Sequence, residues 1–222
     1  MALAAVVSVL ATCPRADCGT DVTRLAGSGV YLGQAPVAVL AVLTVGGEYS
    51  TALIRTTLAA VPGRPTVLAA KALVLTVAVA AIGTPTLLAS LLVARIVVPR
   101  HGYALALAEG PVLRAGAGSV AYLVLIAILG LGVAAVVRDS AAAIGAVLGL
   151  LYLPPVLTRM VTDPRLHRLL EQVAPMTAGP AVQATTDLHR LPIGPWAGLG
   201  VLAAWSAGAL LTGTVLLRVR DT

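Results

Sequence analysis

Charged residues are scarce in this chain. They make up 11% of its 222 residues, whereas a soluble domain carries about 25%. Hydrophobic residues account for 59%, and the mean hydropathy is +0.97. So few charged side chains cannot cover the surface of a soluble domain. The outer surface is therefore expected to face lipid.

Residue types that carry chemistry are also rare. The only lysine, Lys71, does not belong to a Gly-x-x-x-x-Gly-Lys-Ser/Thr loop, so ATP hydrolysis is not expected here. Two cysteines alone do not make a zinc site. Paired carboxylates, a zincin motif and a Ser–His pair are all missing from the apolar runs, which disfavours an intramembrane enzyme. The 15 Lys and Arg residues are scattered singly, so the net charge of +6 does not indicate a nucleic-acid partner.

Long uncharged runs are what the sequence has instead. A helix needs about 20 mostly apolar residues to cross a bilayer, and backbone exposed to lipid must be helical. We therefore expect an all-α, polytopic membrane protein with one transmembrane domain over residues 1–222. The six expected spans are residues 1–13 (incomplete), 25–45, 69–96, 116–137, 141–158 and 196–217.

The N-terminal run 1–13 is too short to span alone. It has three interpretations: a signal-peptide core, a lipoprotein signal ending at Cys13, or a first span whose beginning is missing. The first two lack the basic start that such signals carry. The third is preferred.

The connections between the spans fall into two sets on opposite sides of the membrane. One set holds residues 46–68, the turn at Arg138-Asp139 and the tail 218–222. The other holds residues 14–24, 97–115 and 159–195. Basic residues occur in both sets, so the positive-inside rule does not orient the chain.

A short amphipathic helix is expected in the connection 159–195. Asp163-Pro164 reads as a helix N-cap followed by proline at the first helical position, and Pro175 ends the pattern. Between them Leu166, Leu169, Leu170 and Val173 have helical spacing. This helix would lie on the membrane surface or pack over the ends of the spans.

A second interfacial helix is expected between residues 46 and 71. Gly46-Gly47 should break the preceding span, and Ser50 or Thr51 can cap a new helix. An apolar stripe then runs from Ile54 through Leu58 and Val61, and the segment Pro62–Pro65 ends the helix.

This segment resembles the connection between the second and third spans of bacterial ATP-binding-cassette (ABC) exporter permeases. The subclass is the drug- and polysaccharide-exporter type, with six spans and no fused ATPase. The residues that carry the resemblance are Glu48, Tyr49, Ser50, Thr51, Ile54, Arg55, Thr56, Thr57, Leu58, Ala59, Pro62 and Lys71. Arg138-Asp139 resembles the family's tight cytoplasmic turn. The family often has two basic residues after the proline, where this chain has Gly63-Arg64.

The resemblance implies a permease in the bacterial cytoplasmic membrane that exports a small molecule, drug, peptide or lipid-linked compound. Residues 48–58 would form the coupling helix that docks on an ABC ATPase subunit. Two permeases, identical or different, would work with two ATPase subunits, which hold ATP and Mg²⁺; this chain would hold no cofactor. A non-transporting immunity or regulatory membrane protein with the same fold is the alternative.

Three further features have open interpretations. In the implied orientation Cys13 and Cys18 are extracytoplasmic, where a disulfide is permitted, although free thiols remain an alternative. Thr84-Pro85 should kink the third span, as a static kink or a gating hinge. The Gly145-x3-Gly149 pattern suits close helix packing, as in a dimer.

Overall fold

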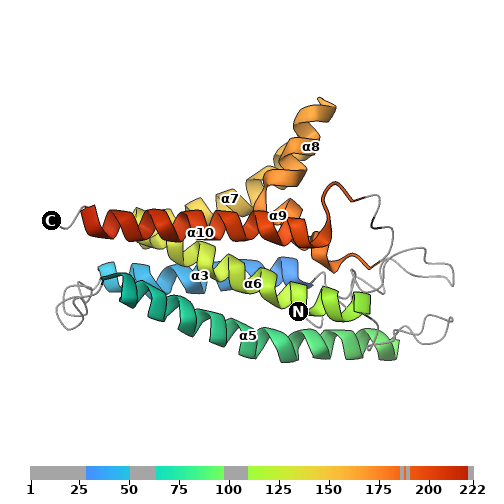
Figure 1. Cartoon of the computed structure of the whole chain (residues 1–222), viewed down its shortest axis with the longest axis horizontal. Coiled ribbons are helices and arrows are strands. Elements are labelled where there is room, and N and C mark those ends of the chain that lie inside the picture. The colour runs from blue at the N-terminus through green and yellow to red at the C-terminus, as the bar shows by residue number, and fades with distance from the viewer. Residues whose placement is uncertain (1–28, 51–63, 98–109, 186–187, 189–190, 220–222) are drawn as a thin grey trace.

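The computed structural model describes residues 29–50, 64–97, 110–185, 188 and 191–219 (Figure 1). Every regular element in these ranges is helical. The helices are α3 (Gly29–Ser50), α5 (Arg64–Val97), α6 (Gly110–Val137), α7 (Ser140–Met160), α8 (Pro164–Val173), α9 (Pro175–Ala178), the 3₁₀ helix η1 (Gly179–Gln183) and α10 (Pro195–Val219).

Five of these helices are long and apolar enough to cross a membrane. They are Gly29–Gly47, Thr66–Leu92, Gly110–Val137, Ser140–Met160 and Pro195–Leu216. The chain is thus a multi-pass helical membrane protein, and five expected spans are confirmed to within a few residues at most ends. The expected first span, 1–13, lies outside the described residues.

Successive spans run in opposite directions (Figure 1). The C-terminal ends of α3 and α10, the start of α5 and the turn between α6 and α7 share one end of the bundle. The starts of α3 and α10, the end of α5, and α8 with α9 lie at the other end. The two expected sets of connections therefore fall at opposite ends of the bundle wherever the structure describes them.

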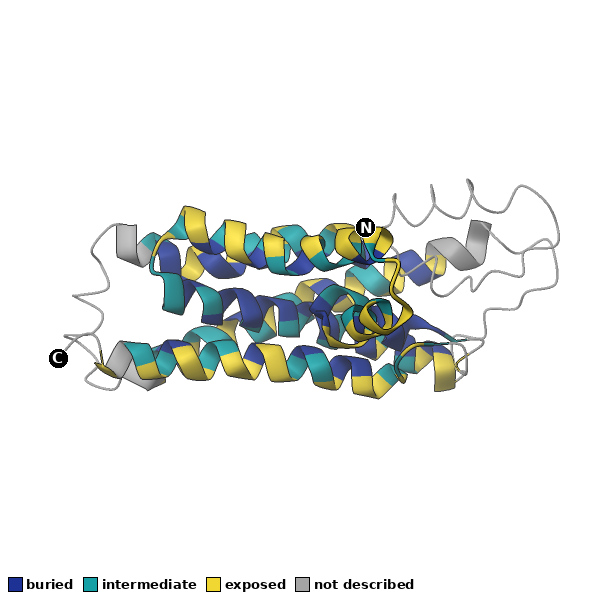
Figure 2. Ribbon diagram, turned by 90° about the horizontal axis from the view of Figure 1, so that it is seen from above, coloured by how far each residue is buried: buried dark blue, intermediate teal, exposed yellow. Residues whose placement is uncertain are grey.

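Helix α6 is the centre of the bundle. It packs against α3, α5, α7 and α10, whereas α3 and α5 have few contacts with each other. The buried share of the apolar window is 56% in α6 but only 6% in α5. The outer helices bury their inward faces and expose the rest (Figure 2). Such exposed apolar faces suit a lipid solvent.

Small residues bring α6 and α10 close together. A Cβ atom added at Gly132 would lie 2.7 Å from the backbone of Ala209 and Leu210, and one added at Gly213 would lie 2.9 Å from the Cβ atom of Ala135. Apolar burial gives little drive for helix association in lipid, so close backbone packing carries much of it. The α6–α10 interface is of this kind.

The expected break at Gly46-Gly47 is wrong. Helix α3 continues through both glycines to Ser50. Gly46 is buried, and a Cβ atom there would lie 2.4 Å from the Oγ atom of Ser140, at the start of α7. The glycine therefore allows two helices to approach each other instead of ending one of them.

The expected helix after Asp163 is confirmed as α8. The Asp163 side chain accepts a hydrogen bond from the backbone N–H of Arg165 over 2.8 Å, and Pro164 occupies the first turn. None of its residues is buried. Figure 1 shows α8 projecting sideways from the bundle, so its axis crosses the span direction. This geometry favours the membrane-surface interpretation.

The residues after α8 turn inward. Helix α9 packs against α7 and α10, and η1 packs against α6 and α10. Val182 and Gln183 of η1 are buried there. A Cβ atom added at Gly118 of α6 would lie 2.2 Å from the Val182 side chain. Short, irregular backbone is tolerated at this depth when protein surrounds it.

Candidate functional site

The first candidate site is the bundle end where α3 leads into α5. Of the expected coupling segment, the backbone of Glu48, Tyr49 and Ser50 forms the last turn of α3. The other members lie outside the described residues: Thr51, Ile54, Arg55, Thr56, Thr57 and Leu58. The structure describes the two helix ends that flank this segment, the end of α3 and the beginning of α5.

A side chain joins these two helices. The Nζ atom of Lys71, in the second turn of α5, donates a hydrogen bond of 2.6 Å to the carbonyl oxygen of Thr44 in α3. Thr44 uses its own hydroxyl to donate to the carbonyl of Ala41 over 2.7 Å. The only lysine of the chain thus links the two helices that flank residues 51–63.

The turn at Arg138-Asp139 completes this end of the bundle. Arg138 has a left-handed backbone conformation (φ 62°), and its N–H donates to the carbonyl of Ala134 over 2.9 Å. Its guanidinium contacts the carbonyl oxygen of Leu216 in α10 at 3.4 Å. Asp139 caps α7 by accepting from the N–H of Ala142 over 2.7 Å. The predicted tight turn is confirmed, and it ties α6, α7 and α10 together.

A buried polar pair lies among the spans. The hydroxyl of Tyr122 in α6 donates a hydrogen bond to the Oε1 atom of Gln34 in α3, and both side chains are fully buried. Nearby, the hydroxyl of Tyr152 in α7 donates to the carbonyl of Tyr31 over 3.2 Å. These bonds fix α3 against α6 and α7. Sequence reasoning singled out neither Gln34 nor the pair.

Other buried polar atoms have no partner among the described residues. They include the Nε2 atom of Gln34 and both amide atoms of Gln183 in η1. Arg114, near the start of α6, donates from Nη2 to the carbonyl of Ala184 over 2.7 Å. This bond holds the residue after η1 against α6.

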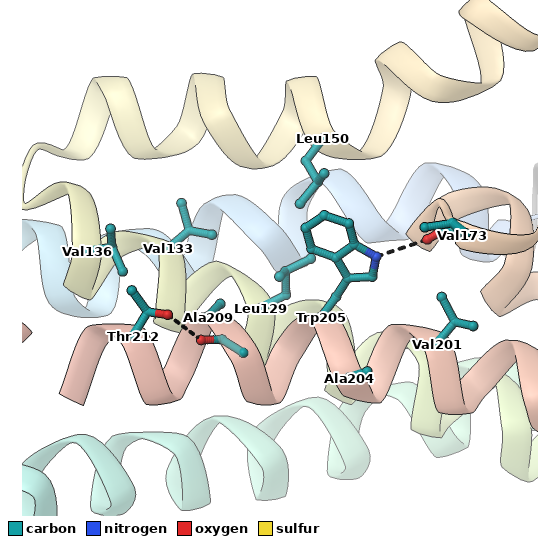
Figure 3. Close-up of a pocket in the computed structure, with 11 residues that line it drawn as sticks. Leu129, Val133, Val136, Leu150, Val173, Val201, Ala204, Trp205, Ala209 and Thr212 are labelled. Atoms are coloured by element: carbon teal, nitrogen blue, oxygen red, sulfur yellow. Dashed lines mark hydrogen bonds between the residues drawn. The ribbon is translucent and has the colours of Figure 1, made fainter. Parts of the chain in front are cut away.

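The second candidate site is an apolar groove between α7 and α10, with α6 as its floor (Figure 3). Its cavity volume is about 640 Å³. The lining residues are Leu129, Val133, Val136, Leu150, Val173, Val201, Ala204, Trp205, Gly208, Ala209 and Thr212. Sequence reasoning missed this groove, because residues of four helices form it.

The expected hinge lies within an unbroken helix. Thr84 and Pro85 are exposed on α5, which runs from Arg64 to Val97. Pro85 has no N–H to donate to the carbonyl four residues earlier. The next residue, Thr86, donates its hydroxyl to the Ile82 carbonyl over 2.6 Å. Figure 1 shows α5 curving along its length, and the gating role stays a prediction.

The remaining features singled out in the sequence are the two cysteines and the Gly145-x3-Gly149 pattern. Cys13 and Cys18 lie outside the described residues. Gly145 and Gly149 are exposed on α7 with open space around them, so no helix that the structure describes packs on them. The described part of the chain holds no group of three His, Cys, Asp or Glu residues that could bind a metal ion.

The chain matches no protein-family model, and no curated protein matches it. Its residues and geometry therefore carry the functional argument. They combine a bundle end stiffened by hydrogen bonds, a polar pair in the core and an apolar groove open on one side.

Proposed function

We propose that this chain is the membrane-spanning permease subunit of an ATP-driven ABC transporter. It would export a small molecule, drug, peptide or lipid-linked compound, while a separate subunit hydrolyses ATP. The segment from Glu48 to Leu58 would be the coupling helix. The proposal rests on the resemblance of residues 48–71 to that family and on the multi-pass helical fold.

The hydrogen bond from Lys71 to Thr44 is the structural observation that best supports the proposal. A coupling element must pass a displacement to the spans, and this requires a stiff base. Here the helices before and after residues 51–63 are joined to each other by that bond.

Contacts at the same end would carry a displacement further. Gly46 of α3 packs against Ser140 of α7, and Arg138 bonds to the end of α10. All four outer spans pack on α6. A push on residues 48–58 would thus reach the whole bundle rather than one helix. The proposed coupling role also implies an orientation, in which this end of the bundle faces the cytoplasm.

Affinity purification from mild detergent tests the proposal. We expect an ABC ATPase subunit to co-purify with the tagged chain in stoichiometric amount. Glu48→Ala and Arg55→Ala should lose that subunit and lose transport, while membrane insertion is unchanged. Arg159→Ala, which alters an exposed arginine at the opposite end of the bundle, is the matched control and should retain both.

The contrary outcome is equally clear. A stable, correctly inserted protein that brings no ATPase would contradict the proposal and favour the non-transporting immunity or regulatory alternative. If the ATPase is present and both variants still bind it and transport normally, the coupling helix is misplaced although the permease role stands.

A further inference from the structure

The groove between α7 and α10 offers an occupant hydrocarbon contacts and almost nothing else. Its two residues with side-chain polar groups use them within the protein. The indole N–H of Trp205 donates to the carbonyl of Val173 over 2.9 Å, and the hydroxyl of Thr212 donates to the carbonyl of Gly208 over 2.8 Å (Figure 3). A polar solute would lose its hydration there without replacement. The occupant is therefore apolar where it lies in the groove.

The apolar surface does not end at the groove. Val173 lines the groove and is also the last residue of α8. It belongs to the apolar stripe of that helix, in which Leu166 is 51% exposed, Leu169 55% and Val173 46%. The stripe and the groove thus form one continuous surface that turns from the span direction toward the direction of α8.

The rest of α8 is polar and carries Arg165, Arg168 and Glu171. Both arginines are exposed. Helical spacing places Arg168 on the side away from the apolar stripe and Arg165 at the edge of the stripe, because Arg165 and Leu169 are four residues apart. A helix with this division lies at the membrane interface, with its arginines at the level of the lipid headgroups. Guanidinium groups bind phosphate oxygens with two parallel hydrogen bonds.

We propose that the groove and α8 together bind one anionic membrane phospholipid. An acyl chain occupies the groove beside Trp205, and the headgroup phosphate meets Arg165 and Arg168. The site does not depend on whether the chain is a permease. It is a lateral site, reached from the bilayer itself.

The size of the groove favours an acyl chain over a protein helix. Its volume of about 640 Å³ is within the range of about 300–1,000 Å³ that holds small ligands. A membrane-spanning helix, about 10 Å wide and about 30 Å long, is too large to enter the groove whole. A flexible chain also follows the change of direction at Val173, which a straight helix cannot do.

Fluorescence quenching tests the site, because the chain has only two tryptophans. In a Trp196→Phe background, Trp205 is the sole tryptophan, and it lines the groove. The purified protein is placed in mixed micelles or bilayers of unlabelled phosphatidylcholine with a rising fraction of phosphatidylglycerol brominated on its acyl chains. We expect quenching of Trp205 to saturate at a low fraction of brominated lipid.

Two leucine substitutions provide a matched pair. Gly208 and Gly145 are both exposed helical glycines with open space around them, but only Gly208 lines the groove. Gly208→Leu should fill the groove and abolish the saturating phase, while Gly145→Leu should leave it intact. Replacing Arg165 and Arg168 by glutamine should raise the half-saturating fraction about fivefold per arginine.

Three results would overturn the proposal. Quenching that rises in simple proportion to the brominated fraction, alike in both leucine variants, means that the groove meets only bulk lipid. Quenching that is unchanged by Gly208→Leu, while a dimer becomes a monomer in detergent, means that a second copy covers the groove. Equal half-saturating fractions for brominated phosphatidylglycerol and phosphatidylcholine remove the role of the arginines.

Discussion

The ammonium group of Lys71 lies 2.6 Å from the carbonyl oxygen of Thr44, and this bond joins the beginning of one span to the end of the span before it. The two residues are 27 positions apart in the sequence. Residues 51–63, which hold most of the proposed coupling helix, lie between them. The bond therefore links the two helices that flank the proposed coupling helix, through which force would reach the membrane spans.

Under the proposed function, removal of this bond should impair coupling between the ATPase and this chain while the protein stays folded. Lys71→Met is expected to lower the free energy of unfolding by about 1 kcal/mol, the usual value for one hydrogen bond. Substrate-stimulated ATPase activity of the complex reconstituted with the ATPase subunit should be largely lost, although the protein is still folded. Lys71→Arg, which keeps the charge and the donors, is the control and should retain most of the activity. If folded Lys71→Met protein keeps the substrate-stimulated ATPase activity of the wild type, the bond has no coupling role.

The Gln34–Tyr122 pair should behave as a buried pair whose separation is costly. Tyr122→Phe leaves the Oε1 atom of Gln34 without its donor, so we expect a loss of about 1 kcal/mol in stability. The double variant Gln34→Leu/Tyr122→Phe should recover part of that loss because no buried polar atom remains unpaired. Thermal unfolding in detergent of the wild type, the single variants Gln34→Leu and Tyr122→Phe and the double variant measures the coupling. Strictly additive losses would show that the pair contributes no interaction energy.

Two glycines at the start of α10 should differ sharply in their tolerance of a methyl group. A Cβ atom at Gly198 would lie 2.0 Å from the carbonyl oxygen of Ala178, whereas none is close at Gly200. Gly198→Ala should therefore destabilise the protein by about 1–3 kcal/mol. Gly200→Ala should be neutral or stabilise it by up to about 1 kcal/mol, because alanine favours a helix. Similar melting temperatures for the two variants would contradict the packing of α9 on α10.

The two ends of α7 should be accessible from opposite sides of the membrane. Asp139 and Thr162 flank this helix and are both exposed. In a background with Cys13 and Cys18 replaced by serine, a membrane-impermeant maleimide added to whole cells should label Thr162→Cys. Asp139→Cys should react only after the membrane is opened. The reverse pattern would invert the proposed orientation without affecting the fold.

Much of the fold follows from the sequence because a bilayer imposes a length and a helical backbone on each span. Residues 141–158 were predicted as a span, and α7 covers residues 140–160. The cap at Asp163-Pro164 correctly placed α8, because proline and a capping carboxylate act locally. Where a feature is local, one sequence is sufficient to place it.

The features that the sequence did not predict are all contacts between helices. Gly46 looks like a helix breaker in isolation, but its neighbour Ser140 is 94 positions away and cannot be inferred from spacing. Gln34 is a single polar residue in an apolar run, and only the arrangement of α3 on α6 shows that it meets Tyr122. The groove at Trp205 depends on the space left between two helices. Such features arise from packing, which periodicity does not report.

The central position of α6 has a consequence for how the protein is made. Helices α3 and α5 leave the ribosome before α6, and apart from the Lys71–Thr44 hydrogen bond they have few contacts with each other. During synthesis they therefore lie in the bilayer with little packing between them. The bundle can begin to assemble only when α6 arrives, and α7 and α10 then add to it in turn. A bulky substitution at Gly132, which packs against α10, should therefore leave every span inserted yet keep α10 from joining the bundle. The cell should degrade this incompletely assembled protein.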